Sequence, residues 1–314
     1  MRRTVLAMAV AACMTFLGCG DSMPSVPNTP DGTVTAVASA LADGKPAVLW
    51  SAMPASYQKD VTELVQQFAA NMDAEVYNKG WDLAKKLGAV LKAKKDFILA
   101  NEMLAQAKID PKEAAAKWDS VVGIVDALTS SQLASLASLK SVNIPGLLST
   151  TGGKVMQCAA ELSKLTKEDP YNTEFVGKLK GVTAEKVKVS DDGKEATIKM
   201  TAPDKYAKDG KSTEELKMVS VEGKWVPKEM ADDWKNAMAE AKKNLDSMSK
   251  DTIGKSKPQI LAMMGAIEPI LDQMLKAETK EQFDMALGQG MMMIMGGAMG
   301  PSSGPPMPMP PGIE

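Results

Sequence analysis

Histidine is absent from this 314-residue chain, and its only arginines, Arg2 and Arg3, lie at its start. Without histidine there is no imidazole to activate a serine or cysteine nucleophile, and the common zinc and copper sites cannot form. Without further arginine there is no guanidinium clamp for phosphate or carboxylate groups. The formal net charge of -2 gives no basic surface for nucleic acid. We therefore expect a protein without enzymatic activity, without a resident cofactor and without a nucleic-acid partner.

Cysteines and aromatic residues are also scarce. The three cysteines are Cys13, Cys19 and Cys158, and only Cys158 lies beyond the first nineteen residues, so no internal disulfide is expected. Cys158 belongs to an apolar helical pattern and is expected to be a buried, inert thiol. Aromatic residues make up 4% of the chain, so alanine, leucine, valine and methionine must fill the core. This composition favours helices over a β-sandwich.

The first eighteen residues have the pattern of a signal peptide. Arg2 and Arg3 supply the positive start, residues 5–17 form an uncharged and mostly apolar run, and Gly18 supplies the small residue before the cut. The run is shorter than the roughly 20 residues that a membrane-spanning helix needs. Cleavage there would change the net charge from -2 to -4, because both arginines leave with the signal peptide.

The residues at the cut resemble the lipobox of bacterial lipoproteins, with Phe16-Leu17-Gly18-Cys19 in this chain. Phe16 stands where the family has leucine, and Leu17 stands where it has a small residue. The resemblance implies acylation of Cys19, and Cys13, inside the apolar run, is a poorer site. Residues 19–32 are polar and contain prolines, as a flexible tether does. Since Asp21 does not directly follow the cysteine, the family's usual inner-membrane retention signal is absent, which favours the outer membrane of the cell envelope. The alternative is an ordinary signal peptide that releases a soluble protein.

The mature chain is predicted to be α+β and predominantly helical. Residues 33–165 show helical periodicity, with helix starts after Pro46, after Pro54 and at Asp110-Pro111, and with a loop over residues 143–153. Residues 229–287 are again helical. From residue 288 to residue 314 the chain is rich in methionine, glycine and proline, and we expect a disordered tail.

Residues 166–228 change to the alternating pattern of a small antiparallel sheet with three or four strands. Asp191-Asp192-Gly193 and Glu222-Gly223 each separate two alternating stretches, so two β-hairpins are predicted. Residues 41–61, together with residues 221–227, resemble exported proteins with a cystatin-like or nuclear-transport-factor-like fold. That resemblance implies an N-terminal helix packed into a curved antiparallel sheet.

Few residues suggest chemistry. Clustered thioethers suit Cu(I), and the tail carries the candidate ligands Met291, Met292, Met293, Met295, Met307 and Met309. A low-complexity or partner-binding segment is the preferred explanation of these methionines, because methionine makes adaptable apolar contacts and no histidine or nearby cysteine would tighten a copper site. Residues 149–154 approach a phosphate-binding loop but lack its first glycine and a preceding strand, so a flexible loop is expected there.

Paired carboxylates, such as Asp191 with Asp192 and Asp232 with Asp233, are interpreted as solvated turns and caps. The five tryptophans lie on apolar stripes or strands, which predicts core packing; they are Trp50, Trp81, Trp118, Trp225 and Trp234. We therefore expect an exported, lipid-anchored, non-enzymatic protein of the cell envelope with a structural or protein-interaction role. Its predicted partners are the membrane and another envelope protein. The alternatives are a small-molecule binding protein with a pocket between sheet and helices, and a Cu(I)-binding tail.

Overall fold

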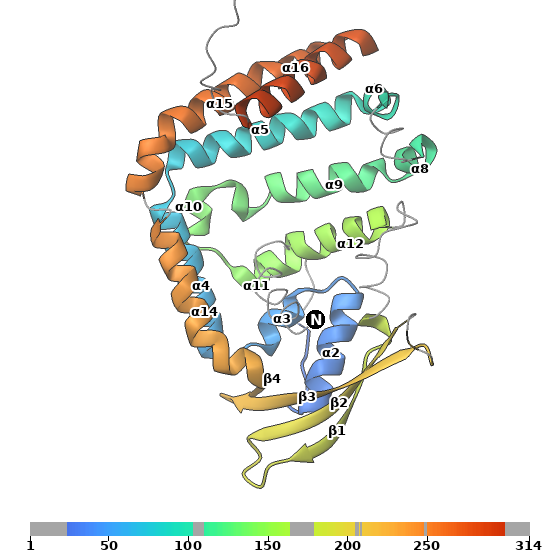
Figure 1. Ribbon diagram of the computed structural model, residues 1–314, viewed down its shortest axis with the longest axis vertical. Helices are drawn as coiled ribbons and strands as arrows, with labels where there is room; N and C mark the ends of the chain where they lie inside the picture. The colour runs from blue at the N-terminus through green and yellow to red at the C-terminus, as the bar shows by residue number, and fades with distance from the viewer. Residues whose placement is uncertain are drawn as a thin grey trace, which may run out of the picture.

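The computed structural model describes residues 24–102, 110–163, 179–204, 207, 209–247 and 250–298. Within these ranges the chain is α+β and predominantly helical, with one four-stranded antiparallel sheet, so the predicted fold class is confirmed. The sheet lies at one end of the long axis, and the helices are stacked beyond it (Figure 1). The predicted signal peptide and Cys19 lie outside the described residues.

The sheet is a meander in which strands that follow one another along the chain pair side by side. Its order is β1 (Thr183–Val189), β2 (Glu195–Pro203), β3 (Lys211–Val221) and β4 (Lys224–Pro227). Both predicted hairpins are confirmed. The turn between β3 and β4 places Glu222 at φ 52° and Gly223 at φ 76°. Two successive positive φ values are typical of the type I′ turn, whose twist matches that of the strands.

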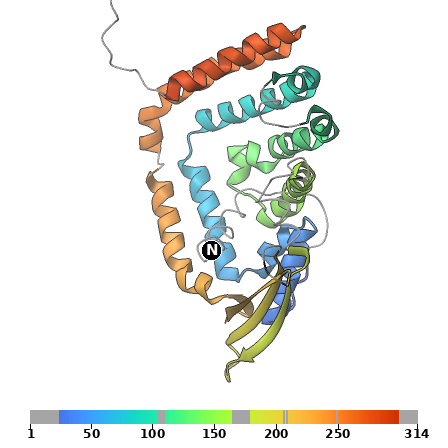
Figure 2. The ribbon, with the colours of Figure 1, turned by 45° about the vertical axis from the view of Figure 1, so that its right-hand side comes forward.

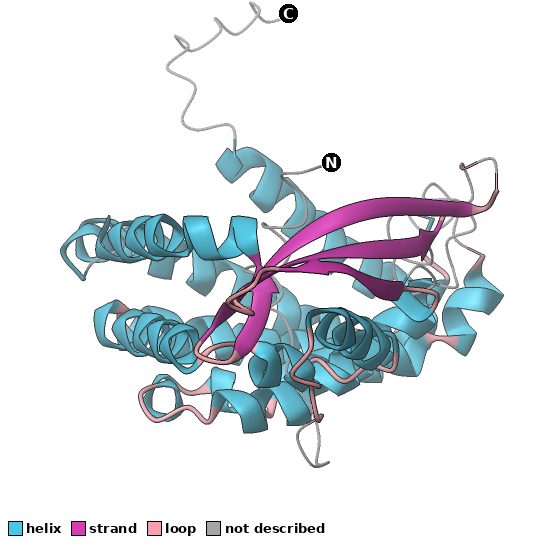
Figure 3. Cartoon of the chain, turned by 90° about the horizontal axis from the view of Figure 1, so that it is seen from below, coloured by secondary structure: helices cyan, strands magenta, loops and turns pink. Residues whose placement is uncertain are grey.

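One face of the sheet is covered by a helix, and much of the other face is exposed along β2 and β3. Ala196, Ile198 and Met218 are buried on the covered face, where Val34 of α2 (Pro30–Ala42) packs against them. Lys199, which alternates with Ile198 along β2, is exposed. Seen from below, the strands lie in front of the helices as one twisted sheet (Figure 3).

Helices from both sides of the sheet in sequence form one body. Before the sheet come α2, α3 (Ala47–Ala52), α4 (Ala55–Asn71), α5 (Ala74–Ala93), α6 (Lys95–Leu99), α8 (Pro111–Ala116), α9 (Trp118–Thr129), α10 (Leu136–Leu139), α11 (Ile144–Leu147) and α12 (Gly153–Leu162). After it come α14 (Lys228–Ser247), α15 (Lys250–Lys276) and α16 (Lys280–Ala298). Helices α12, α9, α5 and α15 pack on one another in that order, and α16 folds back on α15. Helices α4 and α14 run side by side along the flank (Figures 1 and 2).

The main core lies where α14 meets α4. The rings of Tyr57 and Trp234 stack with centroids 3.9 Å apart, and the indole Nε1 of Trp234 donates to Asp60 Oδ2 at 2.8 Å. Trp50 is buried in the same cluster. Core packing is thus confirmed for four of the five tryptophans. These four are buried, namely Trp50, Trp118, Trp225 and Trp234, whereas Trp81 is half-buried.

A second apolar cluster joins α5, α15 and α16. Phe283 of α16 is 0% exposed, and Val90 of α5 is buried beside it. The other buried members are Ile270, Leu271, Met274, Ala277 and Ala286. Lys94 Nζ donates to the carbonyl oxygen of Ala277 at 2.6 Å, which satisfies a carbonyl just beyond the end of α15. This cluster holds the last helix of the described chain in place.

The predicted helix starts are confirmed, but the predicted loop, tether and tail each differ from the structure. The Asp110 side chain caps α8 by accepting from the backbone N–H groups of Lys112 and Glu113. The expected loop at 143–153 is helical instead: α11 leads into one π-helical turn, Leu148–Gly152, which continues as α12. The Asn143 side chain caps this stretch at Gly146 N, and the buried Leu147 and Leu148 hold it against the core.

The other two corrections concern the ends of the body. The expected tether 19–32 is too long, because α2 begins at Pro30 with Thr29 as its N-cap, and Thr33 Oγ1 donates to the Pro27 carbonyl oxygen at 3.0 Å. The expected tail from residue 288 begins inside a helix, because α16 continues to Ala298. Residues 299–314, with the rest of that prediction, lie outside the described residues.

Candidate functional site

The segment that follows the predicted anchor is docked on the β3–β4 turn. Val26, Pro27 and Asn28 line a cavity of about 150 Å³ whose other walls include Gly223 and Trp225. Val26 is the seventh residue after Cys19, and an extended chain of that length spans at most about 25 Å. An acyl group on Cys19 would therefore keep this part of the molecule close to a bilayer.

This cavity is also where the alternative of a ligand pocket between sheet and helices would apply. Its volume lies below the roughly 300–1,000 Å³ of most small-molecule sites. Trp225 forms part of its wall, but Trp50 belongs to the main core and is not among its lining residues. The buried Thr33 is also a lining residue, and its hydroxyl is already bonded to Pro27. An apolar cleft ringed by Trp50 and Trp225 would favour a ligand-binding role, and this cavity is not such a cleft.

The methionine-rich stretch is only partly within the described side chains. Met291, Met292 and Met293 lie in α16 with exposed fractions of 37%, 71% and 41%. Successive residues of an α-helix point about 100° apart, so these three thioethers diverge and do not converge on one ion. Met295 lies in α16 without a described side chain, and Met307 and Met309 lie outside the described residues. Among the described residues, no group of three or more histidine, cysteine or carboxylate side chains is arranged to hold a metal ion.

The largest ion-pair cluster among the described residues joins α5 to α15. Lys86 Nζ lies 2.9 Å from Glu268 Oε1 and 2.7 Å from Asp272 Oδ1, and Lys79 pairs with the other oxygen of Glu268. Hydrogen bonds from the two lysines lower the pKa of Glu268 to about 2. The same contacts, with Asp272 the larger cause, raise the pKa of Lys86. Both groups are thereby held in their charged forms.

A second cluster lies between α15 and the start of α5. Lys257 Nζ is 3.0 Å from Asp73 Oδ2 and 2.8 Å from Glu75 Oε2. The pKa of Asp73 is lowered first by the backbone N–H of Val76 and then by Lys257. Asp73 is also the N-cap of α5, so its carboxylate satisfies the helix start as well as the lysine.

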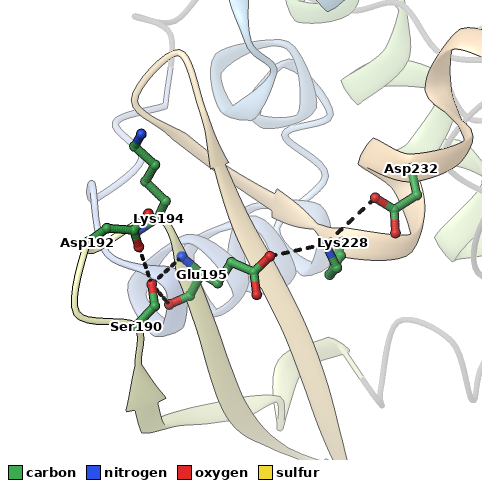
Figure 4. A network of polar contacts seen from close by, with 6 residues as sticks. All are labelled: Ser190, Asp192, Lys194, Glu195, Lys228 and Asp232. Carbon is green, nitrogen blue, oxygen red and sulfur yellow. Dashed lines mark hydrogen bonds and ion pairs between the residues drawn. The ribbon is translucent and has the colours of Figure 1, made fainter.

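The carboxylates at the first hairpin turn form a surface network, which Figure 4 shows. The Ser190 hydroxyl donates to Asp192 Oδ1 at 2.6 Å, and the backbone N–H of Lys194 donates to the same oxygen at 3.1 Å, so the pKa of Asp192 is lowered. Lys228 Nζ contacts Glu195 at 3.1 Å and Asp232 at 3.8 Å, and its pKa is raised, chiefly by Glu195. These groups serve as turn and helix-start contacts, in agreement with the interpretation made from the sequence.

All of these shifts point in one direction. Every carboxyl group or lysine of the described residues whose pKa departs from its ordinary value is shifted toward the charged form. A general acid or base needs the opposite shift, toward neutral pH. These groups are engaged in structural ion pairs and in hydrogen bonds to turns and helix starts.

Cys158 and the segment at 149–154 are both used in packing. Cys158 is buried between α9 and α12, and a Cβ added to Gly123 would lie 3.0 Å from its Sγ. Thr151 and Gly152 are buried within the π-helical turn. The segment is neither the expected flexible loop nor a phosphate-binding loop, since it follows helix α11 and is itself helical.

Sequence reasoning missed the outer face of α16, where Met285, Gly288 and Met292 follow one another at helical spacing. The signal was available, since the sequence has no charged residue from 285 to 298.

No helix among the described residues is long and apolar enough to cross a bilayer. Comparison of the chain with protein-family models, curated proteins and solved structures gives no match.

Proposed function

We propose that this chain is an exported lipoprotein of the cell envelope that is anchored through an acylated Cys19 and acts by contact rather than by catalysis. The observation that carries the proposal is the leader itself: a basic start, a short apolar run and Gly18 directly before Cys19. By its lipobox resemblance the cysteine would receive fatty acyl groups such as palmitate. The absence of an acidic residue directly after Cys19 favours the outer membrane.

The docked segment at Val26–Asn28 supports an anchored role. A fixed N-terminal segment leaves little slack between a lipid on Cys19 and the folded body. Here the capping side chain of Thr29 and the bond from Thr33 to Pro27 fix that segment. A seven-residue connection to the lipid would then hold Val26, and with it the sheet end of the body, within about 25 Å of the bilayer.

The properties of the body support a contact role. The lysine and carboxylate pairs lock neighbouring helices, and their pKa shifts disfavour proton transfer near neutral pH. The cavity beside Trp225 is smaller than most ligand sites. A rigid helical body of this kind is suited to holding a binding surface at a set distance from the membrane.

The proposal is tested by membrane fractionation and intact-mass analysis of the full chain expressed in a bacterial host. The wild type should be in the membrane fraction, begin at Cys19 and carry the added mass of acyl groups. Cys19→Ala should lack the acyl mass, and it should no longer appear as a processed chain in the membrane fraction. Cys13→Ala is the matched control and should behave as the wild type, because residue 13 lies within the apolar run. An unmodified soluble chain that begins at another residue would refute the anchor.

A further inference from the structure

Helix α15 is buried to different depths along its length. In its second half, Ile270, Leu271 and Met274 are buried in the apolar cluster shared with α5 and α16. In its first half, none of the described side chains from residue 254 to residue 269 is buried. The apolar stripe of that half is only half-buried; it consists of Ile260, Leu261, Met264 and Ile267. Full burial therefore begins within the helix, at Ile270.

The first half of α15 contains the same backbone weakness twice. Gly254 precedes Pro258 by four residues, and Gly265 precedes Pro269 by four residues. A proline has no N–H group, so the carbonyl oxygen four residues earlier loses its helical hydrogen bond. Here each such oxygen belongs to a glycine, which is itself a weak helix former. A Cβ added to either glycine would meet nothing within 4 Å, so close packing does not explain them.

The two weak points lie on one side of the helix. They are 11 residues apart, which is close to three full turns, so Pro258 and Pro269 point in nearly the same direction. Both prolines are exposed. Prolines on the exposed side bend a helix around its partner, and α15 runs along α5 (Figure 1). The same residues also make this half of the helix easier to unfold.

Ion pairs hold the first half of α15 on α5. Lys257 Nζ lies 3.0 Å from Asp73 Oδ2 and 2.8 Å from Glu75 Oε2. Glu268, at the junction with the buried half, pairs with two lysines of α5. Between Lys257 and Glu268 the described side chains are half-buried or exposed. Release of Lys257 therefore leaves few contacts that could keep this stretch in place.

We propose that residues 254–268 of α15 form a hinged segment, which detaches from α5 and returns as a unit while the rest of the body stays folded. Pro269 is the hinge, because full burial begins directly after it. Lys257 is the latch, because it reaches two carboxylates at the start of α5. Local opening occurs where a folded protein has few buried apolar contacts, and the hinged segment has none of the buried residues of its helix.

Opening uncovers a surface that the closed body conceals. Met264 lies over Gly80 of α5, since a Cβ at Gly80 would be 3.7 Å from Met264 Cε. When the hinged segment is open, its apolar stripe and the facing side of α5 both reach solvent. The proposal does not rest on the anchor at Cys19, because it concerns contacts between α5 and α15 alone. It gives the body a second conformation.

The test is hydrogen exchange of the full chain, measured by mass spectrometry of its peptides. In the wild type, amides of residues 255–268 should exchange at least about tenfold faster than those of residues 270–276, with a step at Pro269. Pro258→Ala should slow exchange in the hinged segment at least about threefold, because it gives Gly254 a hydrogen-bond donor. Gln259→Ala, at the next exposed residue, is the matched control and should change the rate by less than about twofold.

The latch is tested by substitution and by salt. Lys257→Gln should speed exchange across the whole hinged segment about threefold, whereas Lys255→Gln, at an exposed lysine two residues away, should not. Raising sodium chloride from about 0.05 M to about 1 M shortens the Debye length to about 3 Å. It should therefore speed exchange more in the wild type than in Lys257→Gln, which has already lost the latch.

Several results would overturn the proposal. Equal protection along α15 would show that the first half does not open by itself. A gradual change with no step at Pro269 would indicate fraying from the helix end. Unchanged rates in both Pro258→Ala and Lys257→Gln would leave the hinged segment without a cause. Helix α9 is the internal reference, and faster exchange there as well would show that the whole body opens.

Discussion

Replacement of Phe283 by alanine tests what holds α16 on the body. Phe283 is 0% exposed, and its ring centroid lies 5.9 Å from that of Phe97. Phe283→Ala removes the ring from the cluster shared by α5, α15 and α16 and leaves a cavity. Substitutions of this kind cost about 3–5 kcal/mol, which is a large part of the roughly 5–15 kcal/mol that stabilises an ordinary domain.

The assay is hydrogen exchange of the folded protein combined with urea unfolding followed by circular dichroism. Amides of α16 and of the last turns of α15 should exchange much faster in Phe283→Ala, because α16 is the last helix of the described chain and can detach by itself. If α16 unfolds together with the rest of the body, the free energy of unfolding should fall by up to about 3–5 kcal/mol. Met285→Ala, two residues along the same helix and 64% exposed, is the matched control and should stay within about 0.5 kcal/mol of the wild type.

One result would refute this reasoning. If Phe283→Ala lowers the unfolding free energy by less than about 1 kcal/mol and leaves exchange in α16 unchanged, then the cluster does not hold that helix. The division of α16 into a packed inner face and an exposed outer face would then lose its basis, since the inner face would contribute little. A loss confined to α16, with α4 and α14 unaffected, agrees with the packing observed here.

Two further predictions concern a close contact and a pH dependence. A Cβ at Gly153 would lie 2.8 Å from the backbone oxygen of Gly44, so Gly153→Ala should lower the unfolding free energy by about 1–3 kcal/mol in urea titrations; Gly265→Ala, inside α15 with open space, should raise it by about 0.5–1 kcal/mol. The pKa of Glu268 is about 2 in the folded chain against a usual 4.5, so its contribution is complete above pH 4.5 and is lost as the pH falls toward 2. Unfolding curves of Glu268→Gln between pH 5 and pH 2 should depend less on pH than those of the wild type, and those of Glu240→Gln, at an exposed residue of α14, should follow the wild type. If the free energy of unfolding depends equally on pH in the wild type, Glu268→Gln and Glu240→Gln, the ion-pair explanation is contradicted.

Local signals in the sequence predicted much of the fold. The Asp-Gly and Glu-Gly turns gave both hairpins correctly, because such turns depend on a few residues and their φ values. Asp110 followed by Pro111 predicted a helix start for the same reason, since an N-cap needs only one side chain and the next two amides. The burial of Trp234 followed from its place on an apolar stripe.

Features that depend on distant contacts were not predictable. The segment at 143–153 has the glycine, proline and serine content of a loop, but burial of Leu147 and Leu148 makes it helical. Tertiary packing overrode local propensity there. The end of α16 was missed because methionine and glycine suggest low complexity, whereas docking of Phe283 holds the helix on α15 and α5. The pairing of Lys86 with Glu268 joins residues far apart in sequence, and nothing local to either indicates it.

The ion pairs and the apolar clusters play different roles in this body, because they contribute very different amounts to the free energy of folding. A pair as exposed as Lys86 with Asp272 contributes little, because water and salt screen it. Burial of Phe283 contributes far more, since removal of such a ring costs about 3–5 kcal/mol. The chain nevertheless uses lysines that reach two carboxylates each, such as Lys86 on α5 toward α15 and Lys257 on α15 toward the start of α5. Such pairs add little to stability, but an α5 shifted by one turn along α15 would lose both contacts of each lysine. The apolar cluster therefore supplies the free energy of docking, and the lysines fix the register of α15 along α5.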